Sequence, residues 1–169
     1  VAFITRGGIT PLLQTLKELE HKGIKGRILT TDYLCFSDPS ALDTLAGLSN
    51  VQLRMYQTER AGSGFHTKGY IFQKEEEYHF IIGSSNLTQD ALTKNMEWNT
   101  KMVSTGQGEM IQDIVTEFER IWNAEECTKE YDEFIEEYRK RFEEKKLFEK
   151  MVSEQKEIAK RESVPSIEA

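Results

Sequence analysis

The first 56 residues alternate short apolar runs with segments of helical periodicity, and this alternation constrains the fold more than any other feature. The apolar runs Val1–Thr5, Gly26–Thr31 and Val51–Tyr56 have the length and composition of buried strands. The segments between them begin at Thr10-Pro11 and Asp38-Pro39, which are favourable residues for the start of a helix. Strands that alternate with helices in this way predict a largely parallel sheet flanked by helices.

The next stretch is predicted to add a glycine-rich loop, a hairpin, a further strand and an amphipathic helix, at residues 61–64, 67–82, 97–103 and 108–123. The hairpin consists of two strand-like runs, 67–73 and 77–82, joined at the acidic triplet Glu75-Glu76-Glu77. Three adjacent charges favour an exposed tip. The predicted fold class is therefore α/β, with a mixed, largely parallel sheet.

From residue 125 the chain becomes highly charged, with a narrow apolar stripe at helical spacing. This pattern predicts a long charged C-terminal helix. The helix could be a solvated helix packed on its own domain, or a connector toward a following domain, and we favour the connector. The predicted organisation is a domain at 1–124 and a helical connector at 125–169. Because the sequence begins at Val1, inside a strand-like run, we expect the chain to be a fragment of a longer protein.

The net charge of −7 is concentrated in the C-terminal part. Residues 1–100 hold 10 Lys and Arg against 11 Asp and Glu, and residues 101–169 hold 12 against 18. The first hundred residues are thus nearly neutral, which excludes a broad basic platform but allows a local contact with nucleic acid. Cys35 and Cys127 form no metal-binding or disulfide pattern, so we expect a reducing, cytoplasmic location. No apolar run is long enough to predict a membrane span.

Two short motifs stand at the two ends of the predicted hairpin. His66-Thr67-Lys68 opens its first strand, and Gly83-Ser84-Ser85-Asn86 follows its second. Period-two alternation places His66 and Lys68 on one face, and antiparallel pairing brings them beside Ser84 and Asn86. Lysine, serine and asparagine side chains can donate hydrogen bonds to phosphate oxygens, and histidine can act as nucleophile or general acid and base. The four side chains together predict a phosphodiester site.

Other polar residues are assigned around this site. Glu97, just before the next strand, is predicted to orient the imidazole, as the carboxylate of a catalytic triad does. Gly83 and Ser85 are predicted to contact the substrate, and Arg54 and Arg60 are weaker candidates for its phosphate backbone. The remaining two histidines, His21 and His79, are interpreted as structural. No cluster of residues has the spacing of metal ligands, and no metal or cofactor is predicted.

The paired motifs resemble the signature of the phospholipase D superfamily, which is HxK, then an Asp, then GSxN. The resemblance covers roughly residues 1–123 and implies the fold of that family. It also implies metal-independent hydrolysis, in which one histidine attacks phosphorus to form a phosphohistidine and a second histidine protonates the leaving oxygen. This chain has one such motif, so the second histidine is expected from another copy in a C2 homodimer. The motif Asp would fall at Gln73 and is missing.

Several stretches of the amino-acid sequence are also similar to one subgroup of these proteins. VAFITRGGI, FHTKGYIF and IIGSSNLT resemble the N-terminal nuclease-like domain of bacterial superfamily 2 DEAD/DEAH-type helicases. That resemblance implies a nuclease acting on nucleic acid, with DNA favoured over RNA, and an ATP-dependent helicase core after the connector. No GxxxxGK[ST] motif occurs in the chain, so the chain itself is not predicted to bind ATP.

Two alternatives from other classes stay open. The site could hold a phosphodiester backbone without cleaving it, as a binding module that places a helicase on its substrate. It could also hydrolyse a lipid phosphodiester, although no basic amphipathic helix favours contact with a membrane.

Overall fold

A computed structural model describes the backbone of residues 1–162 and the side chains of residues 1–157. The strands are β1 (Gly26–Thr31), β2 (Val51–Tyr56), β3 (Gly69–Lys74), β4 (Glu77–Gly83), β5 (Asn99–Thr105) and β6 (Thr128–Glu130). The α-helices are α1 (Arg6–Ile9), α2 (Leu13–His21), α3 (Pro39–Ala46), α4 (Thr58–Ala61), α5 (Gln89–Thr93), α6 (Glu109–Trp122) and α7 (Tyr131–Glu162). Two short 3₁₀ turns are η1 (Thr10–Leu12) and η2 (Tyr33–Cys35).

The strands form two three-stranded sheets, in the orders β1-β2-β6 and β3-β4-β5. Only the β1–β2 ladder is parallel, and the other three ladders are antiparallel. The expectation of an α/β fold is therefore confirmed, whereas the largely parallel sheet is not found. The physical reason is connection length, because α3 provides the crossover that a parallel pair needs, whereas the two-residue turn between β3 and β4 permits only antiparallel pairing.

Residues 1–5 lie at the seam between the two sheets. They were expected to form a strand, and they make a single parallel bridge, between Ile4 and Leu87. The amide of Ala2 donates to the carbonyl of Thr67 at 3.0 Å, while its own carbonyl accepts from the hydroxyl of Thr30 on β1 at 3.0 Å. The segment thus ties β1 to the chain that enters β3 and leaves β4.

The hydrophobic core also includes residues that follow the predicted domain boundary at 124. Phe134, Ile135 and Tyr138 of α7 are buried in the main cluster, and Phe142 packs against it. β6 adds to the edge of the first sheet by pairing with β2. The part of α7 that packs on the core therefore extends to about Phe142.

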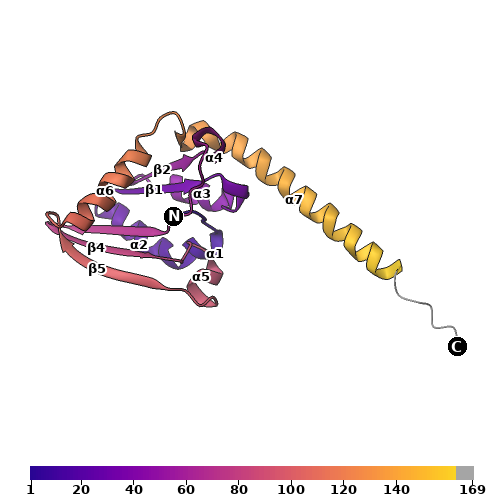
Figure 1. Cartoon of the computed structure of the whole chain (residues 1–169), viewed down its shortest axis with the longest axis horizontal. Helices are drawn as coiled ribbons and strands as arrows, with labels where there is room; N and C mark the ends of the chain where they lie inside the picture. The colour runs from indigo at the N-terminus through magenta and orange to yellow at the C-terminus, as the bar shows by residue number, and fades with distance from the viewer. Residues whose placement is uncertain (163–169) are drawn as a thin grey trace.

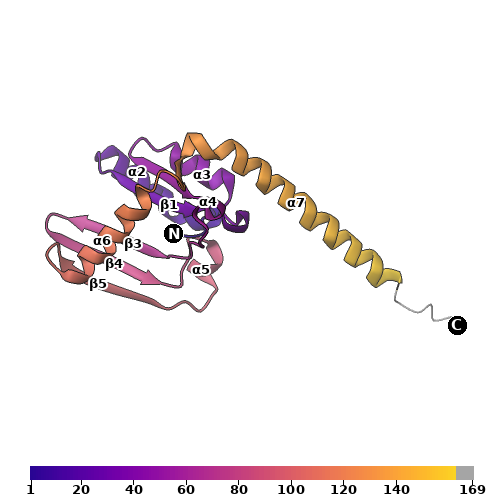
Figure 2. The same ribbon diagram turned by 45° about the horizontal axis from the view of Figure 1, so that its top comes forward.

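The rest of α7 runs away from the body of the molecule (Figure 1). The last seven residues of the predicted connector, 163–169, lie outside the described residues. Helix α6 lies over one face of the β3-β4-β5 sheet (Figure 2). Among residues 1–162, no helix has both the length and the apolar character needed to cross a bilayer.

Candidate phosphodiester site

The β3–β4 hairpin brings the two motifs together as predicted. Gly69 of β3 pairs with Ile82 of β4, and one step further the amide of Gly83 donates to the carbonyl of Lys68 at 3.3 Å. The chain turns back at Glu75, whose φ of 55° lies in the left-handed region. The strand that Lys68 enters therefore lies beside the strand that ends at Ser84.

Phe3, on the seam segment, touches three of the four predicted motif residues. Its amide donates to the side-chain carbonyl oxygen of Asn86 at 3.1 Å. Its ring lies edge-on to the imidazole of His66, with centroids 5.9 Å apart, and 5.8 Å from the ammonium of Lys68. Because the carbonyl oxygen of Asn86 is engaged by Phe3, the amide NH₂ is the group that Asn86 can offer to an anion. His66 and Lys68 thus lie beside the ring of Phe3, and Asn86 is bound to its main-chain amide.

Ser84 is held in place by Trp98, which directly precedes β5, and by Glu97. Its amide donates to the carbonyl of Trp98 at 3.0 Å, and its hydroxyl accepts from the amide of Trp98 at 3.0 Å. The same hydroxyl donates to the carboxylate of Glu97, which also accepts from the side-chain amide of Asn95 at 3.5 Å. Glu97 was predicted to orient the imidazole of His66. The structure places its carboxylate on Ser84 instead.

His66 is exposed and lies just before β3. The ring of Tyr33, the first residue of η2, is edge-on to its imidazole at 5.1 Å between centroids. The ammonium of Lys68 donates to the main-chain carbonyl of His66 at 2.7 Å. The site therefore presents an accessible imidazole, an ammonium, an amide and a hydroxyl at one end of the hairpin, and these groups suit a phosphate oxygen better than a metal ion.

A comparison with known families agrees with this chemistry. Residues 8–122 match a family model described as the PLD-like domain of cardiolipin synthase. The chain belongs to the phospholipase D-like family. Domains of this superfamily are commonly phosphodiesterases, and the matched region contains both motifs. A search of curated proteins gives no match to the chain.

Two residues predicted to contact substrate have structural roles in this phospholipase D-like domain. A Cβ on Gly83 would lie 2.2 Å from the carbonyl oxygen of Trp98, so the close approach of β5 requires glycine there. Ser85 is only 7% exposed, and its hydroxyl accepts from the side chain of Asn99 at 2.7 Å. Its carbonyl accepts from Tyr70 at 3.2 Å, and burial raises the pKa of the Tyr70 hydroxyl, which keeps that donor protonated.

The two arginines lie in different settings. The guanidinium of Arg54 donates to the carbonyl of Trp122 at 2.7 Å and to Glu130 at 2.6 Å, and it stacks on the Trp122 ring at 4.8 Å. Arg54 therefore fastens β2 to α6 and β6, and the structure does not bring it to the motif residues. Arg60 is exposed on the short helix α4.

The remaining polar positions lie away from the site. Gln73, at the position of the family's Asp, is near the hairpin tip, where its side chain donates to the carbonyl of Glu75 at 3.2 Å. His79 pairs with Glu77 near the same tip, and His21 ends α2.

Sequence reasoning missed three aromatic residues at this site. Phe3 and Tyr33 contact His66, and the Trp98 side chain is 84% exposed beside Ser84. Phe3 is part of a run that reads as an ordinary buried strand, so no sequence signal marked it. Trp98 had a usable signal, because it directly follows Glu97.

Proposed function

We propose that this domain hydrolyses phosphodiester bonds of nucleic acid without a metal ion, with His66 as the nucleophile. The observation that carries the proposal is the grouping of His66, Lys68 and Asn86 around Phe3, with Ser84 at the same end of the hairpin. Such a group of fixed donors can stabilise negative charge that develops on phosphoryl oxygens.

In the proposed reaction a ring nitrogen of His66 attacks phosphorus, and the bond from phosphorus to the leaving oxygen breaks. The second imidazole, His66 of another copy, gives its proton to that oxygen. It then takes a proton from water, which attacks the phosphohistidine, releases the phosphate ester and restores His66. Lys68, Ser84 and Asn86 hold the phosphoryl oxygens in both steps. The proposal therefore requires a C2 homodimer with both histidines in one site.

Nucleic acid is proposed over lipid because of what surrounds the donors. The Trp98 side chain is 84% exposed and Met96 is 93% exposed, on either side of Glu97. An exposed aromatic ring beside phosphate donors suits a nucleobase, which can stack on it while its backbone reaches the donors.

The biological setting is proposed from the resemblance to helicase N-terminal domains. That resemblance favours DNA over RNA as the substrate. The part of α7 beyond Lys145, which leaves the body of the molecule, supports its role as a connector toward a helicase core (Figure 1).

A binding module that holds DNA without cleaving it is the second candidate. It is favoured by the internal hydrogen bond of Ser84, whose hydroxyl donates to the carboxylate of Glu97. That hydroxyl proton is then less available to a reacting phosphate, although a bound substrate could replace the contact.

One experiment separates the two candidates. The protein is incubated with labelled single- and double-stranded DNA in EDTA, beside a His66→Ala variant and a matched His79→Ala control. The nuclease proposal expects cleavage by the parent and the control and none by His66→Ala. Binding by all three proteins without any cleavage would support the module, and cleavage that disappears in EDTA would refute the metal-free mechanism. Sedimentation that shows only monomer under conditions of cleavage would refute the shared site.

A further inference from the structure

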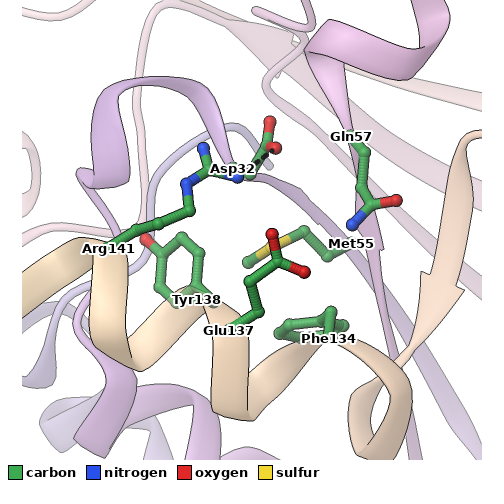
Figure 3. A pocket seen from close by; sticks show the side chains of 7 residues that line it. All are labelled: Asp32, Met55, Gln57, Phe134, Glu137, Tyr138 and Arg141. Carbon is green, nitrogen blue, oxygen red and sulfur yellow. Dashed lines mark hydrogen bonds and ion pairs between the residues drawn. The ribbon is translucent and has the colours of Figure 1, made fainter.

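Helix α7 contacts the loop that follows β1, residues 32–37, through three side chains on one of its faces. The hydroxyl of Tyr138 donates to the carbonyl of Ser37 at 2.8 Å and accepts from the amide of Ser37 at 3.1 Å. One turn further, Arg141 donates to the carboxylate of Asp32 at 3.3 Å. Figure 3 shows Arg141 reaching from the helix to Asp32, with Tyr138 beside it.

The third contact joins a lysine of α7 to an aromatic ring that lies near the site. The ammonium of Lys145 lies 4.2 Å from the centre of the Phe36 ring. That ring is edge-on to Phe3 at 4.9 Å, and Phe36 also lies 6.5 Å from Tyr33. Phe3 and Tyr33 are the two rings that contact His66. Three rings, Phe3, Tyr33 and Phe36, therefore form an aromatic cluster that connects α7 to the proposed nucleophile.

The loop has a conformation that depends on its surroundings. Leu34 and Cys35 have φ angles of 49° and 48°, in the left-handed region that residues with a Cβ rarely adopt. Asp32 is 2% exposed, and its carboxylate accepts from Arg141 and from the amide and hydroxyl of Thr58, both at 2.9 Å. A buried carboxylate needs such partners, so Arg141 helps to fix the start of the loop.

We propose that α7 sets the position of His66 through this loop and the aromatic cluster. Arg141 and Lys145 are then positioning residues for the phosphodiester reaction, because they act on His66 through Asp32, Phe36 and Tyr33. The inference rests on the proposed function for its catalytic meaning. It also gives the docked part of α7 a purpose beyond packing, since any change in how the helix lies on the domain would move the imidazole.

The first test measures the imidazole itself and needs no turnover. Proton–carbon NMR spectra of the full chain contain signals from three histidines, and a His66→Gln variant identifies the one from His66. Lys145→Ala is compared with Lys146→Ala, which removes the next lysine of the same helix, whose ammonium lies 4.6 Å from the Phe142 ring. We expect the His66 signal to shift in Lys145→Ala and to stay at its parent position in Lys146→Ala.

A second matched pair examines the other contact. Arg141→Met removes the partner of Asp32, whereas Arg139→Met removes the arginine that pairs with Asp43 at 3.1 Å. The His66 signal is expected to shift only in Arg141→Met, with the signals of His21 and His79 unchanged in both. If the His66 signal stays at its parent position in both Lys145→Ala and Arg141→Met while the proteins remain folded, the coupling is refuted.

Activity provides a readout that a purely structural role would not give. A displacement of about 1 Å at a reacting group can cost up to about a hundredfold in rate. We therefore expect Tyr33→Leu to lower kcat at least about tenfold with KM little changed, and Tyr33→Phe, which keeps the ring, to restore it. Equal kcat in Tyr33→Leu and the parent would overturn the positioning role. Should the parent cleave nothing, the NMR comparison still decides the coupling, so failure of the proposed function and failure of this inference are distinguishable.

Discussion

Replacement of Gly83 by alanine tests whether the close approach of β4 and β5 builds the site. A Cβ at this position would lie 2.2 Å from the carbonyl oxygen of Trp98 and 2.7 Å from the Cα of Asn99. Both obstacles are main-chain atoms, which cannot rotate away. Since an ordinary carbon–oxygen contact is about 3.3 Å, β5 must retreat by roughly 1 Å. That movement strains the two hydrogen bonds, each 3.0 Å long, that join Ser84 to Trp98.

The expected cost follows from these contacts. Overpacking of this kind typically costs about 1–3 kcal/mol, and each weakened hydrogen bond contributes on the order of 0.5–1 kcal/mol. We therefore expect Gly83→Ala to lower the free energy of unfolding by about 2–5 kcal/mol in total. For a chain of this size, such a loss lowers Tm by roughly 4–20 °C. Because Ser84 moves with β5, phosphodiesterase activity should fall as well.

Gly69→Ala provides the matched control for this prediction. Gly69 lies one pair away in the same hairpin, opposite Ile82, and a Cβ there would meet nothing within 4 Å. It should be neutral or stabilise the protein by about 0.4–1 kcal/mol. Urea denaturation monitored by circular dichroism gives both values, with the slope m as a check that the unfolded states are comparable. If the two variants unfold at the same urea concentration, the reasoning about strand approach is wrong.

Three further predictions follow from single side chains. Trp98→Ala should weaken binding of single-stranded DNA roughly tenfold, the equivalent of about 1.4 kcal/mol of base stacking, in a fluorescence anisotropy titration, while the unfolding midpoint stays unchanged because the ring is exposed. Ser85→Ala should cost about 1 kcal/mol of stability in urea denaturation, because it removes the buried acceptor of Asn99. Burial and the hydrogen bond to Asp43 raise the pKa of Tyr131 to about 12, above its ordinary value of about 10. That contribution to stability should be present below pH 10 and lost between pH 10 and 12, and Tyr131→Phe should make the alkaline decline shallower.

The local sequence pattern was sufficient to predict those helices and strands whose signals lie within the element itself. The strands at Gly26–Thr31 and Val51–Tyr56 have the predicted bounds, and α3 begins at the Pro39 that marked its first turn. The hairpin was also predictable, because two period-two runs with a charged junction have one obvious pairing. The position of Lys68 beside Gly83 follows from that pairing alone.

Elements that depend on distant partners could not be predicted in the same way. β6 consists of Thr128, Lys129 and Glu130, a polar triplet that is a strand only because the edge of β2 is free to pair with it. Residues 1–5 join the two sheets partly through hydrogen bonds to Thr67 and Leu87, each more than 60 positions away in the sequence. A short stretch of sequence does not reveal these distant partners. Phe3, which contacts the motif residues, belongs to this same segment.

The position of Gln73 shows that the spacing of a family motif has to be converted into distance along the strand before a residue is assigned to the site. At about 3.3 Å per residue, five steps along β3 carry the chain about 17 Å from Lys68. Gln73 pairs with Tyr78 beside the hairpin tip, and its side chain contacts Glu75 there. An aspartate at this position would lie equally far from His66 of the same chain, so its loss leaves the donors around Phe3 unchanged. The carboxylate that the structure does bring to these donors is Glu97, which accepts a hydrogen bond from the hydroxyl of Ser84.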